Sequence, residues 1–580
     1  MNDTVLVVGA GPVGLTAACQ LARLGVRVRV VEALERPTTE SRAVGVHARS
    51  LEMLAALGVL PQLEARGRRM PGLAVLDGRT GATRLRIDAT RIPSRHAYVL
   101  DVPQPDTEAV LADRAAELGV VVQRGVRLTG LDQDAEGVEV TLHAGAGEET
   151  TRVGWVVGAD GGHSTTRTLA GTKLAGGFHG QHFAMADVDV DTTFPPDAIR
   201  MFQHPDGMAM LFPMAGERAR VMFFVEPPAA DADDPTLEQI QALADDRMAG
   251  RVKVRNPRWL TYFEVHHAQV PRYRLGRVLL VGDAAHIHSP AGAQGMNTGI
   301  QDAANQAWKL ALVAQGQAGS ELLDTYDDER HPIGAAVVRT TTMMTNVGTA
   351  TGPEAAVRNL GLFLVGHLPR LADAGAAAMT ETTINYRGSA LSVHVGAHRR
   401  GAAKVGEHAP DPDGLTRPDG TPVTVEELLT SPGMLLLVRS GDDDAVGELL
   451  ATAERNPAQL AYTAERLRQT ASERRERIAY AATLENQGYR VWSEPSVPWT
   501  RNLHWLRDAE GQEITPEAHE TCAGRAVAIS YDWDWAPGAE AAYRQANELG
   551  DLDTADLFTE VSRGIDKWLW FVEAHLQAER

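Results

Sequence analysis

A glycine-rich turn close to the N-terminus constrains the fold of this chain more than any other feature. The turn, Gly9–Gly14, reads Gly-Ala-Gly-Pro-Val-Gly and follows an apolar run at residues 4–8 that is typical of a buried strand. Apolar residues then recur at helical spacing from Pro12 to Leu24, and a second apolar run covers Val26–Val31. A strand, a helix and a second strand in this order predict a parallel sheet with a right-handed crossover.

The three glycines predict a dinucleotide site at this turn. Gly9 permits the tight turn, Gly11 lets the backbone approach a pyrophosphate, and Gly14 allows close packing of the helix. The helix that begins at Pro12 supplies amide groups and a dipole that favour a diphosphate. Glu32 ends the second strand, where an acid receives the ribose hydroxyls of an adenosine. The alternative is an incidental glycine turn with an exposed Glu32, which this context disfavours.

Length, charge and cysteine content exclude several classes of protein. The 580 residues are too many for one ordinary core, so we expect several domains. A net charge of −20 repels a phosphate backbone, which argues against a nucleic-acid partner. The chain has only two cysteines, no apolar run long enough to span a membrane and no basic, cleavable leader. We therefore expect a cytoplasmic protein with no membrane partner.

Two later apolar runs end in acidic turns and resemble central strands. The first covers residues 155–158 and precedes Asp160, and the second covers residues 277–281 and precedes Asp283. The intervening residues, 180–270, alternate more often and are rich in methionine and phenylalanine, which predicts an inserted antiparallel domain. These methionines and phenylalanines suit either an aromatic pocket or an ordinary sheet core.

Three ordered motifs resemble the group A flavin monooxygenases of the para-hydroxybenzoate hydroxylase fold, which include phenol, polyketide and rifampicin hydroxylases. The motifs are Gly9–Gly14, Gly158–Ser164 with Arg167, and Gly282–Asp302, and the resemblance covers roughly residues 4–435. It implies an α/β fold, with a three-layer, Rossmann-like FAD-binding domain, an inserted β-rich substrate domain and a divergent C-terminal region. The expected FAD domain comprises residues 1–178 and 271–350, and the expected substrate domain comprises residues 179–270. Residues 351–440 are expected to form the first part of a thioredoxin-like domain, and residues 441–580 are unassigned and largely helical.

The resemblance also implies roles for individual residues of this chain. Arg42 is expected to meet FAD phosphate or ribitol, although a solvated surface arginine is the alternative. Gln104 is expected to contact the ribitol region, and Asp283 to accept hydrogen bonds from the ribitol hydroxyls rather than cap the next helix. Asp160 and Gly161 are expected at the flavin and pyridine-nucleotide side of the site.

Two further segments are assigned through the same resemblance. Pro290–Asn297 is expected beside the flavin ring, with Pro290, Gly295, Met296 and Asn297 in the site and amide donors that stabilise charge on reduced flavin. Arg167 is expected either to contact the nicotinamide phosphate or to form a salt bridge that holds its motif together.

The chemistry implied by the family needs no protein nucleophile. NADPH or NADH reduces FAD, oxygen forms a flavin C4a-hydroperoxide, and oxygen is transferred to an aromatic, phenolic or polyketide-like substrate. No catalytic residue is assigned, and Tyr262 and His286 are candidates for a substrate-activating base on position only. His286 and His288 also suggest a metal pair, but no third ligand is apparent nearby, so no metal is expected. The alternatives are a flavin reductase or epoxidase acting on an isoprenoid, and a flavin-fold protein that binds a ligand without turnover.

The C-terminal region departs from the family pattern. His408 replaces the arginine usual in relatives, and the expected remainder of a third domain is not found. Residues 554–577 instead resemble the last helix of a mini-ferritin, without the earlier helices that carry iron ligands. The apolar stripe from Leu557 to Leu576 must be covered by this chain or by a partner, which includes a second copy.

Overall fold

The computed structural model describes residues 4–145, 147–229, 232–287, 294–349, 369–392, 404–408, 421–429, 490–491 and 506–507. The chain divides into two compact units, Met1–Leu435 and Leu436–Arg580. In the second unit, β21 (Arg490–Val491) pairs antiparallel with β22 (Leu506–Arg507). Pro290, His288 and the segment 554–577 lie outside the described residues. No described helix is long and apolar enough to cross a membrane.

A six-stranded sheet forms the centre of the first unit, and its order is β18-β19-β12-β1-β2-β8. Its strands are parallel apart from the β18 and β19 pair. The parallel strands read as continuous apolar runs because both faces of the sheet are covered. The strands are β1 (Val5–Val8), β2 (Val28–Glu32), β8 (Val122–Arg124), β12 (Trp155–Gly158), β18 (Arg274–Leu275) and β19 (Val278–Leu280).

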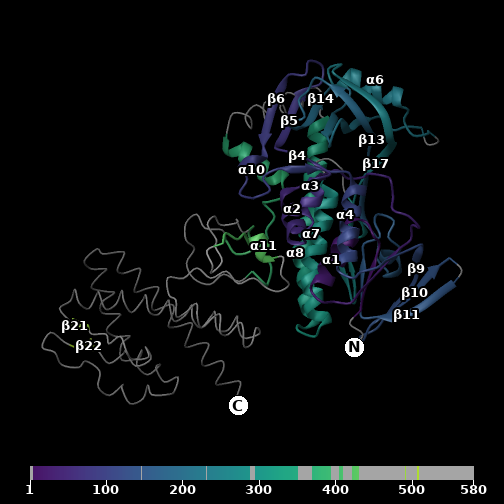
Figure 1. Cartoon of the computed structure of the whole chain (residues 1–580), viewed down its shortest axis with the longest axis vertical. Coiled ribbons are helices and arrows are strands. Elements are labelled where there is room, and N and C mark those ends of the chain that lie inside the picture. The colour runs from purple at the N-terminus through teal and green to yellow at the C-terminus, as the bar shows by residue number, and fades with distance from the viewer. Residues whose placement is uncertain are drawn as a thin grey trace, which may run out of the picture. The chain divides into compact units, whose positions relative to one another are not determined.

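Helices and a small antiparallel sheet complete three layers around this centre. The helices α1 (Pro12–Arg23), α4 (Gln104–Glu117) and α7 (Gln294–Ala314) lie together (Figure 1), and α8 (Asp324–Thr349) packs on α7. The strands β9 (Val126–Gln133), β10 (Val138–Ala144) and β11 (Gly147–Val153) contribute apolar side chains to the same core. This arrangement agrees with the three-layer domain that the family resemblance implies.

A second sheet has eight strands in the order β20-β17-β13-β16-β15-β14-β5-β6. All neighbours are antiparallel except β14 and β5. Two of the strands, β5 and β6, precede residue 179, so the sheet extends beyond the segment 179–270 expected from sequence. The strands are β5 (Gly72–Asp77), β6 (Thr83–Asp88), β13 (Ala175–Thr192), β14 (Ile199–Gln203), β15 (Ala209–Pro213), β16 (Arg218–Val225), β17 (Val252–Gln269) and β20 (His286–Ile287).

The two faces of this second sheet have different neighbours because successive side chains of a strand point to opposite sides. Ala184 and Phe223 belong to the face that packs on α6 (Leu237–Arg247), a helix that begins with a capping box between Thr236 and Gln239. The opposite face carries a methionine-rich cluster and meets the three-stranded sheet β3-β7-β4. The buried members of this cluster are Val44, Met70, Val99, Phe183, Met185, Ile199, Met208, Met210, Phe212, Met214 and Met222.

Short elements link these layers. The strands of the three-stranded sheet are β3 (Gly45–Val46), β4 (Arg68–Met70) and β7 (Val99–Asp101). The remaining described helices are α2 (Ala48–Ala56), α3 (Leu60–Glu64), α5 (Thr165–Leu169), α10 (Pro369–Met379) and α11 (Val425–Leu429), with 3₁₀ turns η1 (Ala89–Arg91), η2 (Gly282–Ala284) and η3 (Ser320–Leu323). The turn η2 is separated from the end of β19 by one residue and carries Asp283.

Candidate FAD site

The sequence-predicted residues meet at one edge of the six-stranded sheet. Strands β1, β2, β12 and β19 run parallel, with Val8 opposite both Val31 and Gly158. The residues that follow these strands therefore emerge at the same edge, as the carboxyl ends of parallel strands do. This edge collects the glycine turn after β1, Glu32 at the end of β2, Asp160 after β12 and Asp283 after β19.

At two of the three glycines, neighbouring backbone atoms leave no room for a side chain, whereas the third faces open space. Gly9 has a φ of 104°, and a β-carbon there would lie 2.4 Å from the Ala159 carbonyl oxygen. A β-carbon at Gly14 would lie 2.1 Å from the Gly9 carbonyl oxygen, whereas one at Gly11 would meet nothing within 4 Å. The start of α1 has no side-chain cap and no acidic residue in its first turn. Uncapped amides beside open space fit the diphosphate of FAD.

Glu32 is held at this turn by backbone amides. Its Oε2 accepts a hydrogen bond of 2.7 Å from the Ala10 amide, and its Oε1 accepts one of 2.8 Å from the Leu34 amide. The side chain is half-buried. Each carboxylate oxygen retains a lone pair after these bonds, so the group suits ribose hydroxyls.

Asp283 lies on η2, where this turn meets α1 and α7. The residue keeps access to solvent. The surrounding protein nevertheless desolvates its carboxyl group and raises its pKa, and the positive charges of His286, Arg42 and Arg167 only partly offset this rise. Close packing brings the elements together: a β-carbon at Gly299 of α7 would lie 2.5 Å from a Val13 methyl carbon of α1. Within the described residues its carboxylate makes no hydrogen bond, which disfavours the capping alternative and leaves both oxygens for a ligand.

We expect Asp283→Ala to raise the FAD dissociation constant of the purified protein. Each hydrogen bond lost to a ligand hydroxyl weakens binding by about 0.5–1.5 kcal/mol. Fluorescence titration of the apoprotein with FAD measures the effect, and Asp283→Asn, which keeps one acceptor oxygen, is the control. If Asp283→Ala binds FAD as tightly as the unaltered protein, Asp283 does not contribute to the FAD site.

Arg42 and Gln104 lie near the same edge. Arg42 is exposed, its Nη2 lies 2.9 Å from Glu40 Oε2, and its charge partly opposes the burial that raises the pKa of Asp283. Gln104 accepts a hydrogen bond of 3.1 Å from the Ala43 amide and donates one of 2.8 Å to Glu108 Oε1. The Gln104 amide thus fixes the segment after Arg42, and its contact with ribitol remains a prediction.

The second motif uses its polar side chains inside the protein. Asp160 accepts hydrogen bonds from the Thr166 amide at 2.9 Å and from the Thr166 hydroxyl at 3.0 Å, at the start of α5. Gly161, with a φ of 75°, has open space where a β-carbon would stand. Arg167 is buried and donates to the carbonyl oxygens of Ala284 at 3.1 Å and Gly162 at 2.6 Å. It joins the second and third motifs through carbonyl oxygens, and no ion pair of Arg167 occurs among the described residues. Its contact with the nicotinamide phosphate stays a prediction.

The first turn of α7 is tied to β3. Asn297 is fully buried, with its Oδ1 accepting from the His47 amide at 2.8 Å and its Nδ2 donating to the Gly45 carbonyl at 2.9 Å. Since the side chain is used in this way, the backbone of this turn is what remains for the flavin. Met296 is buried and Gly295 is half-buried.

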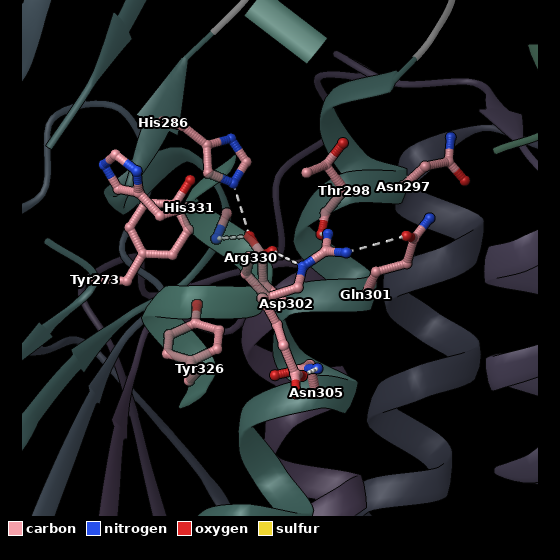
Figure 2. Close-up of polar contacts among 12 residues, drawn as sticks. Tyr273, His286, Asn297, Thr298, Gln301, Asp302, Asn305, Tyr326, Arg330 and His331 are labelled. Atoms are coloured by element: carbon pink, nitrogen blue, oxygen red, sulfur yellow. Dashed lines mark hydrogen bonds and ion pairs between the residues drawn. The ribbon is translucent and has the colours of Figure 1, made fainter. Parts of the chain in front are cut away.

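Neither candidate for the substrate-activating base is suitably placed. Tyr262 packs against the cluster beneath α6, on the face of the second sheet that lies away from the methionine-rich cluster. His286 is fully buried, and its Nε2 lies 2.7 Å from Asp302 Oδ2 (Figure 2). The sequence alone did not reveal this partner, because Asp302 lies 16 residues after His286. The available signal was the helical pattern of residues 294–314, which places Asp302 one turn after Thr298.

One group of three potential metal ligands, a histidine and two aspartates, lies elsewhere among the described residues. Ligand-type atoms of His204, Asp206 and Asp246 lie within 4.8 Å of one another. The His204 Nδ1 already accepts a hydrogen bond of 3.3 Å from the Asp206 amide, and both carboxylates are exposed. We assign no metal to these residues.

Comparison with known proteins gives consistent matches. A family described as an FAD binding domain matches residues 2–341. The 6-methylpretetramide 4-monooxygenase of Streptomyces rimosus is 36% identical over 453 residues, which cover 77% of this chain and 80% of the relative. The rifampicin monooxygenase of Streptomyces venezuelae is 39% identical over 62% of this chain and 75% of its own length. The solved anhydrotetracycline hydroxylase OxyS of Streptomyces rimosus superposes with a TM-score of 0.65 at 34% identity, covering 78% of this chain and 88% of that one.

Proposed function

Because the chain belongs to the group A FAD-dependent aromatic monooxygenases, we propose that it uses NAD(P)H and dioxygen to hydroxylate a polycyclic phenolic or polyketide-like substrate. The names of these three relatives refer to 6-methylpretetramide, rifampicin and anhydrotetracycline, which supports a large aromatic substrate. The same names give no support to an isoprenoid epoxidase or to a binding protein without turnover.

The methionine-rich cluster is the observation that carries this proposal. Its partly exposed members offer aromatic and thioether surface, which suits flat and bulky ligands. The Phe183 ring stacks on Phe263 with centroids 5.4 Å apart and meets Phe224 edge-on at 5.7 Å. The partly exposed members are Leu73, Met201, Phe224, Trp259, Phe263 and Met379.

The cluster also adjoins the expected position of the flavin ring. Val44 belongs to the cluster, and the next residue, Gly45, accepts a hydrogen bond from Asn297 on the first turn of α7. A substrate against the cluster is therefore close to the start of α7. Apolar side chains there hold the aromatic ring system and exclude water from the reacting atoms.

Bound FAD, once reduced by NAD(P)H, supplies the activation of dioxygen. The protein's own residues bind and orient. We assign the diphosphate to the Gly9–Gly14 turn with Pro12, the adenosine ribose to Glu32, and the ribitol to Asp283 with Arg42 and Gln104. The Asp160–Gly161 turn and the Gly295–Asn297 backbone then border the flavin ring, whereas Pro290 lies outside the described residues and its role stays a prediction from sequence.

A reducing cytoplasm is the compartment that we propose. Cys19 is free and buried, and burial raises the pKa of its thiol to about 12. Such a thiol is inert, as expected of a small apolar side chain rather than a redox group.

The proposed reaction is tested by oxygen incorporation. Purified protein is incubated with labelled dioxygen, with NADPH or NADH, and with polycyclic phenols, rifampicin and a single-ring phenol. We expect polycyclic substrates to accelerate nicotinamide oxidation and to gain one labelled oxygen atom, detected by mass spectrometry. Hydrogen peroxide is measured as the control for uncoupled oxidation. Flavin reduction that yields only peroxide with every aromatic compound would contradict hydroxylation.

A further inference from the structure

Asp302 lies at the centre of a buried polar network behind the candidate site. The residue is on α7 and is fully buried. Its Oδ1 accepts a hydrogen bond of 2.7 Å from Arg330 Nε, and its Oδ2 accepts from His286 Nε2 at 2.7 Å and from the Gly282 amide at 3.2 Å (Figure 2). Both oxygens of one carboxylate are thus used by three donors, which come from two other segments, residues 282–286 and α8.

Two of these donors flank Asp283. Gly282 directly precedes it, and His286 follows it three residues later. Asp302 therefore holds the η2 turn on both sides of the residue whose carboxylate is left for a ligand. Gly282 has a φ of 57°, a left-handed conformation that glycine adopts readily, and a β-carbon there would lie 3.1 Å from a Val13 methyl carbon.

The charge state of the network is defined by its partners. Burial raises the pKa of Asp302, but Arg330 and His286 outweigh it and hold that pKa below its usual value. Asp302 is consequently ionised and acts only as an acceptor, so the His286 Nε2 must carry a proton. A buried carboxylate is stable here because a buried arginine compensates its charge.

Arg330 extends the same network to the first turns of α7. Its Nη2 donates to the Thr298 carbonyl at 3.1 Å, and its Nη1 donates to the Tyr386 hydroxyl at 3.2 Å. Beside it, the Tyr326 hydroxyl donates to the Leu280 carbonyl at the end of β19, at 2.7 Å. The network thus fixes both elements that border the flavin, the end of β19 and the start of α7.

We propose that Asp302 is a positioning residue for FAD, which sets the Asp283 turn and the start of α7 against the flavin through His286, Gly282 and Arg330. This inference rests on FAD binding in the proposed function but not on the identity of the substrate. None of these side chains needs to contact the cofactor. Their effect is to keep the Asp283 carboxylate where ribitol hydroxyls are received.

Asp302→Asn is the first test. An asparagine has one acceptor oxygen and a donor amide, so an N–H group would face either Arg330 or His286. We expect the FAD dissociation constant to rise at least tenfold, measured by fluorescence titration of the apoprotein. We also expect the reduction potential of bound flavin to shift, because the amide dipole at α7 moves relative to the ring.

Two substitutions of His286 separate the hydrogen bond from the packing. The amide nitrogen of His286→Gln reaches the place of Nε2 and can donate to Asp302, whereas His286→Leu fills similar space without a donor. We expect the Gln variant to keep FAD affinity within threefold and the Leu variant to lose it as Asp302→Asn does. Equal losses in both would overturn the proposal.

Glu329→Gln is the matched control. Glu329 is a buried carboxylate next to Arg330, but its Oε2 accepts from Lys309 at 2.7 Å and Asn305 at 2.6 Å, away from η2. We expect a lower thermal midpoint with unchanged FAD affinity and flavin potential. An equal loss of affinity in Glu329→Gln and Asp302→Asn would show a general structural effect and overturn the proposal. FAD binding is measured without substrate. The test of Asp302 therefore stands even if the hydroxylation assay of the proposed function fails.

Discussion

Gly11→Asp is expected to weaken FAD binding severely while leaving the fold intact. A β-carbon at Gly11 meets nothing within 4 Å, and its φ of −74° is open to any residue. The new carboxylate would occupy the space in front of α1 that suits a diphosphate. Two like charges 4 Å apart repel by about 4 kcal/mol at an effective dielectric constant of about 20. We therefore expect affinity to fall by roughly two to three orders of magnitude.

Flavin absorbance of the purified variant and its thermal midpoint measure the two halves of this prediction. Gly11→Asn is the neutral control of similar size and should lose much less affinity. Gly14→Ala should behave in the opposite way, because its methyl group would lie 2.1 Å from the Gly9 carbonyl oxygen and destabilise the turn itself. A yellow Gly11→Asp protein with normal flavin content would mean that the diphosphate binds elsewhere.

Asp187→Ala is expected to lower the stability of the first unit strongly. Asp187 in β13 is fully buried, and its Oδ1 lies 2.7 Å from Arg220 Nε in β16, which is also buried. Arg220 also donates to the Ser41 carbonyl, so the pair joins the second sheet to the segment before Arg42. Removal of one partner of a buried ion pair costs about 3–5 kcal/mol because the other charge is left uncompensated. Thermal and urea denaturation with saturating FAD measure this loss.

The double variant Asp187→Leu with Arg220→Met is the control for that experiment. It removes both charges and replaces them with apolar groups of similar volume, so it should recover much of the stability lost by Asp187→Ala. A double variant as unstable as the single one would show that the Ser41 contact of Arg220, rather than the ion pair, is the important interaction.

The local conformation of the glycine turn was predictable from sequence. Three glycines lie where a strand passes into a helix, and the pattern of this motif assigns a task to each. Gly9 has a positive φ, Gly11 leaves the approach to the backbone open, and Gly14 allows a close contact of the helix. Glu32 could be placed for the same reason, because one strand and one crossover separate it from the turn. The family motifs then gave the three-layer domain and the cofactor.

Long-range contacts decided which polar side chains remain available to a ligand. Asp160, Gln104 and Asn297 all occur at predicted positions, yet their side chains bond to nearby or distant parts of the protein. Asp283 makes no such bond within the described residues. A motif fixes where a residue stands along the chain, but a hydrogen-bond partner comes from whichever segment packs against it.

The sequence by itself determined the local features of this protein: the glycine turn, the strand that ends in Glu32, the strand that precedes Asp283, and the helices that follow. Only the tertiary structure decided that β5 and β6 join the second sheet, that Met210 faces the FAD domain while Tyr262 faces α6, and that Asp302 meets His286 and Arg330. Alternation along a strand defines two faces of the sheet, but it does not determine which face packs on a helix and which packs on another sheet. Partners brought together from distant segments depend on how whole elements pack, since the free energy that selects them arises only when their surfaces are buried together.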